Sequence, residues 1–163
     1  MNKLSDISIF EIKPGDPLLD EMEGLFAHLY QYMGGTGLQM PLADGGEKMW
    51  RKSIEKLAGG RFGMLLGAKS DEKLIGFAHG AIRYSADYLG GLKVGYVTHL
   101  FVIPELRSTG IGKKLLSDIE GWFDSKDVHS YELQVLCDNS LGIRFWENMG
   151  YKRELLQMRK PRN

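Results

Sequence analysis

Residues 100–112 decide the fold, and they read Leu100-Phe101-Val102-Ile103-Pro104-Glu105-Leu106-Arg107-Ser108-Thr109-Gly110-Ile111-Gly112. A strand-like run ends at the proline, a short loop follows, and a helical pattern begins at the glycines. The first amides of a helix have no internal partner and lie at the positive end of its dipole, so they bind phosphate oxygens. Glycines at 110 and 112 let a ligand approach the backbone. The segment therefore predicts a phosphate-binding loop, to which Arg107 adds a positive charge.

Two other phosphate motifs fit this loop less well. A P-loop requires glycine where Arg107 stands and Ser or Thr where Lys114 stands. A dinucleotide fingerprint requires glycine or alanine where Leu115 stands, and its strand does not end in proline. From the glycines alone, an ordinary strand–loop–helix junction stays open as an alternative.

Strand-like runs precede the loop and alternate with helical patterns after it. Before it, we expect a strand over residues 7–12, helices over 17–33 and 44–58, and three strands over Arg61–Lys69, Leu74–Ser85 and Leu92–Ile103. After it, we expect a helix over Thr109–Ser125 with Ile111, Leu115, Ile119 and Trp122 on one face, a strand over Tyr131–Leu136, a short helix capped by Asn139 or Ser140, and a final strand over Tyr151–Lys160.

These elements predict the architecture. Hairpin-length connections make the middle strands antiparallel, and the helix between Ile103 and Tyr131 makes a parallel crossover. We therefore expect an α/β protein with a mixed sheet and helices on both faces, a three-layer α/β/α arrangement. The length of 163 residues suits a single domain over residues 1–163.

Composition narrows the choice of partners. The chain has 21 basic and 21 acidic residues, so it has no net field to attract nucleic acid or anionic lipid. Cys137 is the only cysteine, which excludes an intrachain disulfide and is compatible with a cytoplasmic protein. We see neither a signal-peptide pattern at the N-terminus nor an apolar run long enough to cross a membrane. A homodimer is left open.

Two motifs together resemble the GNAT superfamily of N-acetyltransferases. The first is Arg/Gln-x-x-Gly-x-Gly/Ala after a Leu-x-Val-x-Pro strand, which is matched by Leu100–Pro104 and Arg107–Gly112. The second is an asparagine that opens a helix, followed by an aromatic pair and then by Gly-aromatic, which is matched by Asn139 and Phe145–Tyr151. The strong resemblance covers about a third of the chain, from Leu100 to Tyr151.

The resemblance implies acetyl-CoA as co-substrate. Backbone groups of Phe101 and Val102 would pair with the pantetheine arm, and the loop amides would hold the pyrophosphate. Asn139 would hydrogen-bond the arm, with Phe145 packed beside it. The implied cofactor-binding residues are Leu100, Phe101, Val102, Arg107, Ser108, Thr109, Gly110, Ile111, Gly112, Lys113, Asn139, Phe145 and Trp146.

The residues for catalysis depart from the family pattern. The family often has a glutamate base where this chain has Tyr96, and a tyrosine acid where it has Trp146. His99 and Tyr96 are our catalytic candidates, because a histidine with an ordinary pKa of about 6.5 suits a base. A hydrogen-bonded core histidine is the alternative for His99. His79 and Cys137 are better explained as structural residues.

The predicted reaction is direct attack of a small-molecule or peptide amine on the thioester. The alternative is a non-catalytic acyl-CoA-binding or sensing module, which the missing glutamate and tyrosine favour slightly. The acceptor is expected between the first two helices and the loop at 84–91. Its candidate residues are Tyr30, Tyr32, Gln39, Tyr84, Asp87 and Tyr88, since aromatic rings with an acid suit a cationic amine.

Overall fold

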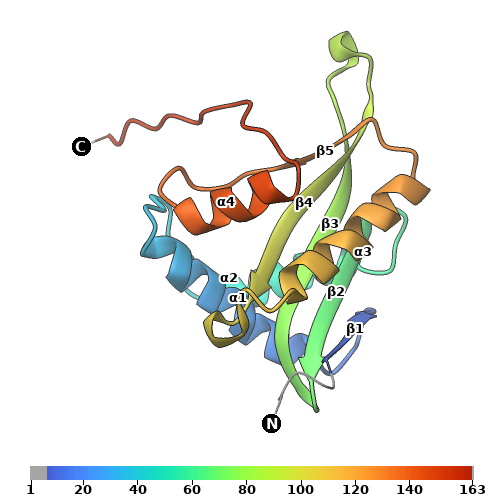
Figure 1. Ribbon diagram of the computed structural model, residues 1–163, viewed down its shortest axis with the longest axis vertical. Coiled ribbons are helices and arrows are strands. Elements are labelled where there is room, and N and C mark those ends of the chain that lie inside the picture. The colour runs from blue at the N-terminus through green and yellow to red at the C-terminus, as the bar shows by residue number, and fades with distance from the viewer. Residues whose placement is uncertain (1–6, 163) are drawn as a thin grey trace.

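A computed structural model describes residues 7–162, with a five-stranded sheet and helices on both of its faces (Figure 1). In chain order the strands and α-helices are β1 (Ile7–Glu11), α1 (Leu19–Gly34), α2 (Gly46–Leu57), β2 (Gly63–Ser70), β3 (Lys73–Tyr84), β4 (Lys93–Val102), α3 (Ile111–Ser125), β5 (Ser130–Leu133) and α4 (Ser140–Asn148). Short 3₁₀ turns cover Asp87–Leu89 and Pro104–Leu106.

The sheet has the predicted mixture of directions. Its order is β1-β2-β3-β4-β5, and neighbouring strands are antiparallel except for the parallel pair β4 and β5, which α3 connects. The β3–β4 ladder contains one irregularity: His79 pairs with His99, but the next residue, Gly80, pairs with Val97. Thr98 is therefore an extra residue on β4, as in a β-bulge.

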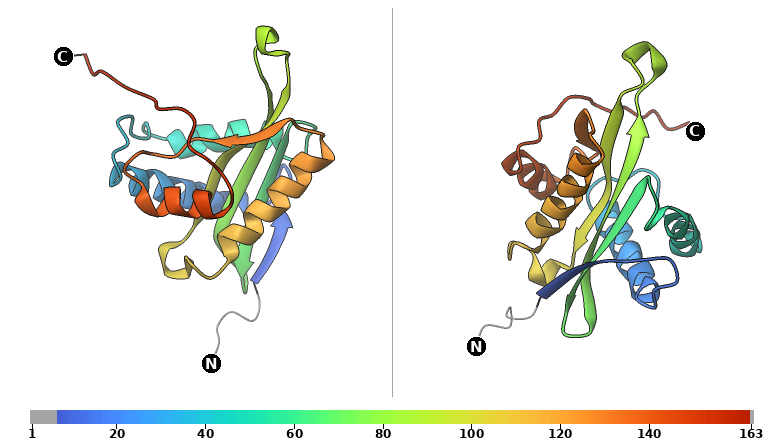
Figure 2. Two further views of the ribbon diagram at one scale, coloured as in Figure 1. Left: turned by 45° about the horizontal axis from the view of Figure 1, so that its top comes forward. Right: turned by 90° about the vertical axis from the view of Figure 1, so that its right-hand side faces the viewer.

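The two faces of the sheet carry different helices, as the edge-on view in Figure 2 shows. Helix α3 covers one face, with α4 on the same side, and buries Ile111, Leu115, Ile119 and Phe123 at helical spacing. Phe123, rather than the predicted Trp122, is the fully buried aromatic at the end of α3.

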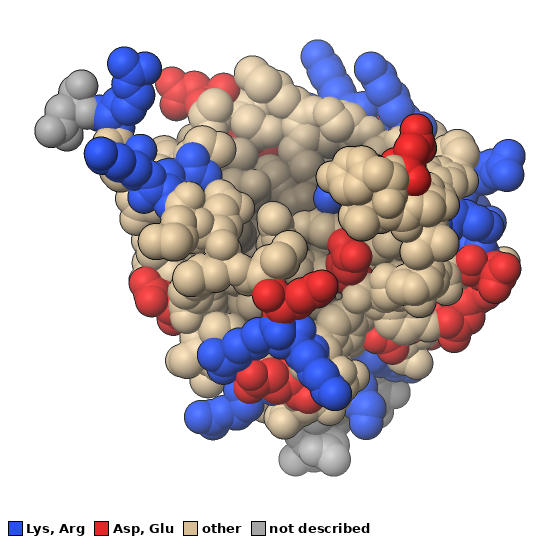
Figure 3. Space-filling model, turned by 90° about the horizontal axis from the view of Figure 1, so that it is seen from above, with Lys and Arg blue, Asp and Glu red and all other residues tan. Residues whose placement is uncertain are grey.

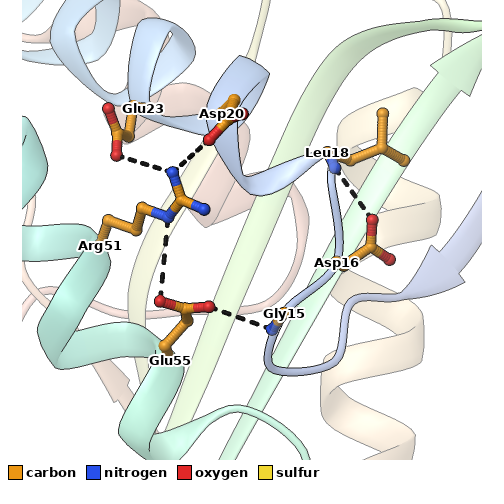
Figure 4. A network of polar contacts seen from close by, with 7 residues as sticks. All are labelled: Gly15, Asp16, Leu18, Asp20, Glu23, Arg51 and Glu55. Carbon is orange, nitrogen blue, oxygen red and sulfur yellow. Dashed lines mark hydrogen bonds and ion pairs between the residues drawn. The ribbon is translucent and has the colours of Figure 1, made fainter.

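Helices α1 and α2 cover the other face, and a polar network joins them (Figure 4). Arg51 of α2 forms ion pairs with Asp20 and Glu23 of α1, and lies 3.8 Å from Glu55 on its own helix. Glu55 in turn accepts a hydrogen bond from the amide of Gly15 at 3.0 Å, which ties in the turn before α1. Phe26 of α1 also stacks on Trp50 of α2 with ring centroids 4.1 Å apart, and Trp50 packs against Phe77 of β3, so aromatic rings join the helix pair to the sheet.

The final strand predicted over Tyr151–Lys160 is wrong. Residues 151–162 have no helix or strand, and Leu155, Leu156 and Met158 are exposed. The hydroxyl of Tyr151 donates to Glu120 of α3 at 2.8 Å, and beyond it the chain runs away from the body (Figure 1). A strand requires a hydrogen-bonded neighbour, and the adjacent apolar pair at 155 and 156 also breaks the alternation of a half-buried strand.

Candidate active site

The loop between β4 and α3 presents a run of free backbone amides. Among the described residues, none accepts a hydrogen bond from the amides of residues 108–113. Ser108 and Gly110 have φ of 61° and 92°, and this left-handed backbone turns the chain into α3. At Gly112 an added Cβ would have its nearest contact at 3.6 Å, with the ring of Phe145. The loop therefore has the geometry of an anion site at a helix N-terminus.

Arg107 is held beside this loop by the strand that precedes it. Its Nε donates to the carbonyl oxygen of Val102 at 3.1 Å, and its guanidinium lies 4.3 Å from the ring centroid of Tyr32 on α1. The carbonyl expected to pair with the pantetheine arm is thus bonded to Arg107 in this structure. An arm paired at Val102 has to share or release this bond.

Strands β4 and β5 part in front of the loop. Their pairing ends at Val97 with Leu133, although β4 continues to Val102, so residues 98–102 of β4 have no β5 partner. Helix α4 begins after this opening and is capped by Asn139, whose Oδ1 accepts from the amide of Gly142 at 3.0 Å. Phe145 packs against Trp146 with centroids 5.0 Å apart, and its ring faces Gly112.

His99 lies on the sheet face that α1 and α2 cover, beside the opening. Its ring makes edge contacts with Phe26 and Trp50, at centroid distances of 5.3 and 5.7 Å. Burial, together with the positive charge of Arg83, lowers the pKa of His99 to about 4. The imidazole is therefore neutral near pH 7, and is a weaker base than an ordinary histidine.

Two charged residues that were not predicted from the sequence flank Tyr96. The guanidinium carbon of Arg83 lies 3.5 Å from the ring centroid of Tyr96. Glu132 pairs with Tyr96 across the β4–β5 ladder, so the two share a face of the sheet. Arg83 could have been found from the alternation of side chains along β3, which puts it on the same face of the sheet as His79. The register of β5 was not readable from sequence.

The predicted acceptor residues fall into two separate groups. Tyr30 and Tyr32 lie on α1, whereas Tyr84, Asp87 and Tyr88 are exposed on the β3–β4 hairpin end, which projects from the body (Figure 1). The loop after α1 instead contacts the loop before α4, where a Cβ on Gly37 would lie 2.8 Å from a carboxylate oxygen of Asp138. Seen from the hairpin end, the surface is hollowed and lined mostly by residues other than Lys, Arg, Asp and Glu (Figure 3).

Other features lie outside this region. A shallow groove lined by Cys137, Ser140, Ile143, Arg144, Glu147 and Arg153 includes none of the predicted site residues. Within residues 7–162, no group of three or more His, Cys, Asp or Glu side chains is arranged to hold a metal ion. None of the helices in that range is long and apolar enough to cross a membrane.

Known proteins that resemble this chain in sequence or in fold include acetyltransferases. The chain is 26% identical over 88 residues to an aminoglycoside N(6')-acetyltransferase type 1 of Salmonella typhimurium, a match that covers 52% of this chain and 59% of that protein. Its fold resembles aminoglycoside acetyltransferase AAC(6')-Iy, solved with a CoA bisubstrate analogue, with a TM-score of 0.75, 19% identity and coverage of 98% and 100%. An acetyltransferase structure from Pyrococcus furiosus gives a TM-score of 0.73 at 22% identity, covering 96% of this chain and 99% of that one.

The family assignment rests on a longer match. Residues 26–151, which include the loop, the opening between β4 and β5, and α4, match the family described as Acetyltransferase (GNAT) family. This range is well over half of the 163 residues. The chain therefore belongs to the GNAT acetyltransferase family.

Proposed function

We propose that this protein transfers the acetyl group of acetyl-CoA to an amine by direct attack on the thioester. One observation carries the proposal: the free amides of residues 108–113 adjoin a length of β4, residues 98–102, that β5 leaves unpaired. A pyrophosphate with an extended amide-bearing arm is the ligand that matches an anion site continued by a free strand edge.

In this proposal the cofactor is held mainly by backbone. The loop amides bond the pyrophosphate, and the arm pairs with β4 at Phe101 and Val102. Arg107 turns from the Val102 carbonyl toward the phosphates, which frees that carbonyl for the arm. On the far side, Asn139 uses its side-chain NH₂ on the arm, because its Oδ1 already caps α4.

The acceptor amine lies on the α1–α2 face, beside His99 and Tyr96. The amine attacks the thioester carbonyl, the tetrahedral intermediate loses a proton, and CoA leaves as its thiolate. His99 accepts that proton or orients the amine by hydrogen bonding, since its imidazole is neutral at working pH. Trp146 cannot donate a proton to the thiolate as a tyrosine would, so orientation and backbone donors carry more of the catalysis.

The acceptor class is a small-molecule or peptide amine. The named relatives are aminoglycoside acetyltransferases, so aminoglycosides belong in the first panel. The chain spans only about three-fifths of the curated relative's length, and Arg83 adds a positive charge beside Tyr96. The panel therefore also includes amino acids and peptides, whose carboxylates this charge would favour.

The assembly and compartment are proposals as well. A homodimer is supported by the exposed apolar side chains of Leu155, Leu156 and Met158, which a second copy would cover. Light scattering on the whole chain and on a chain ending at residue 152 tests this, since only the longer one should be dimeric. A cytoplasmic location is supported by the single cysteine, Cys137.

The decisive experiment measures release of free thiol from acetyl-CoA across the amine panel. Turnover of any amine above the rate without acceptor supports the transferase. Tight binding of CoA with no turnover on any amine would favour the non-catalytic alternative. A Gly112→Asp variant serves as the control for thioester hydrolysis that does not pass through the site.

A further inference from the structure

Thr98 makes three close contacts through a single hydroxyl group. Its Oγ1 lies 2.5 Å from Nδ1 of His79, 3.0 Å from Nδ1 of His99 and 3.1 Å from the carbonyl oxygen of His79. The bulge makes this arrangement possible, because Thr98 is the residue of β4 without a cross-strand partner. It therefore shares the face of its neighbour His99 instead of alternating away from it.

Counting hydrogen atoms gives one consistent assignment. Each of the three contacts requires a hydrogen between the two atoms, and the carbonyl oxygen cannot supply one. The hydroxyl supplies its single hydrogen to that carbonyl. Both imidazoles must then donate from Nδ1 to the two lone pairs of Oγ1, so each ring carries a proton on Nδ1.

The environment of the other ring nitrogens agrees with this assignment. Among the described residues, His79 Nε2 is buried and has no hydrogen-bond partner, whereas His99 Nε2 is not among the buried unpaired atoms. A buried lone pair without a partner costs less than a buried cationic ring, and burial lowers the pKa of His79 to about 3. Both imidazoles are therefore neutral near pH 7, and the single ring proton of each is the one on Nδ1.

We infer that Thr98 is a positioning residue that fixes His99 as the Nδ1–H tautomer, so that its Nε2 lone pair faces the acceptor amine. The inference rests on the proposed function only for the role of that lone pair. Three aromatic rings, Phe26, Trp50 and Phe77, restrict rotation of the His99 ring. With the ring held and Nδ1 committed to Thr98, Nε2 is the nitrogen left to accept an N–H from the substrate.

The tautomer is measured directly, without any substrate. In protein containing ¹⁵N-labelled histidine, the two ring nitrogens of His99 report which one carries the proton, and a His99→Gln variant identifies its signals among those of the four histidines. We expect a protonated Nδ1 and an unprotonated Nε2 between pH 6 and 8. A His99 with its proton on Nε2 would overturn the inference whether or not the protein is an acetyltransferase.

Two substitutions at Thr98 test the link to turnover. Thr98→Val keeps the shape and removes the hydroxyl, and should produce a mixture of His99 tautomers with kcat lowered at least about tenfold. Thr98→Ser keeps the hydroxyl and should retain the tautomer, with kcat within about threefold of the original. If Thr98→Val keeps both the tautomer and kcat, Thr98 has no positioning role. If the original protein has no turnover on any amine but shows the Nδ1–H tautomer, the proposed function fails while the assignment of the hydroxyl contacts stands.

Discussion

The cofactor half and the acceptor half of the site are built from different parts of the chain. The proposed cofactor half is mainly one continuous loop and its neighbouring strand, and its proposed binding groups are mostly backbone amides, with left-handed backbone at Ser108 and Gly110. The acceptor half gathers side chains from α1, α2, β3, β4 and β5 onto one face of the sheet. A backbone site depends on a few residue types at fixed spacing, whereas a side-chain site depends on which segments the fold brings together.

The largest effect is expected from a side chain added to the backbone site. Gly112→Asp puts a carboxylate where the pyrophosphate is proposed to bind, and its Cβ meets nothing closer than 3.6 Å in the free protein. The fold should persist while CoA affinity falls at least about 100-fold, measured by calorimetry. Gly121→Asp is the matched control, since it adds the same group to an open position of α3. Equal affinities in the two variants would mean that the loop holds no pyrophosphate.

A smaller effect is expected at Arg107, which contacts both halves. Arg107→Ala removes a charge proposed to bind the pyrophosphate, so the Kd for CoA should rise about tenfold. Because Tyr32 also loses its stacked guanidinium, the acceptor KM should change too, by less than about threefold. Arg61→Ala, a loss of the same charge on an exposed residue, should change neither constant. A larger change in acceptor KM than in CoA affinity would assign Arg107 to the acceptor half.

The two histidines on the proposed acceptor face, His79 and His99, should make the stability of the protein depend on pH. Burial lowers the pKa of His79 from an unfolded value near 6.5 to about 3. Between these values the unfolded chain binds more protons, so the free energy of unfolding should fall as pH falls, by up to ~1.4 kcal/mol per pH unit for this histidine. His79→Gln should reduce that slope in denaturant unfolding between pH 6.5 and 4, whereas His129→Gln, at an exposed position, should not. Parallel slopes for all three proteins would contradict the burial of His79.

The smallest effect is expected at the projecting hairpin. Tyr88 is 88% exposed and separated from α1, so Tyr88→Ala should leave kcat/KM for the best acceptor within about twofold. Tyr30→Ala is the comparison, because it changes a partly buried ring that contacts Phe26. A loss of more than tenfold at Tyr88 would show that the hairpin closes over the acceptor during turnover.

The sequence predicted the elements that carry local signals. The order of strands and helices up to α4, the parallel crossover and the cap at Asn139 are all present. Residue patterns along one segment suffice for these. The final strand failed because strand formation depends on a neighbour that the local pattern does not reveal. Arg83, Glu132 and the bulge at Thr98 were missed because each becomes significant only through the register of two strands.

Two glycines of the sheet, Gly80 and Gly95, influence the position of the loop between β4 and α3. A Cβ at Gly95 would come within 2.5 Å of the ring of Phe123, and one at Gly80 within 2.9 Å of Ile119. The C-terminal end of α3 thus packs directly on the backbone of β3 and β4 at these glycines. This contact lies about 18 Å along the helix axis from Ile111. A methyl group at Gly80 or Gly95 would push this end of α3 away from the sheet. The amides at the opposite end of the helix would then shift relative to the edge of β4. The absence of side chains at Gly80 and Gly95 therefore helps to align the proposed phosphate site with the edge of β4.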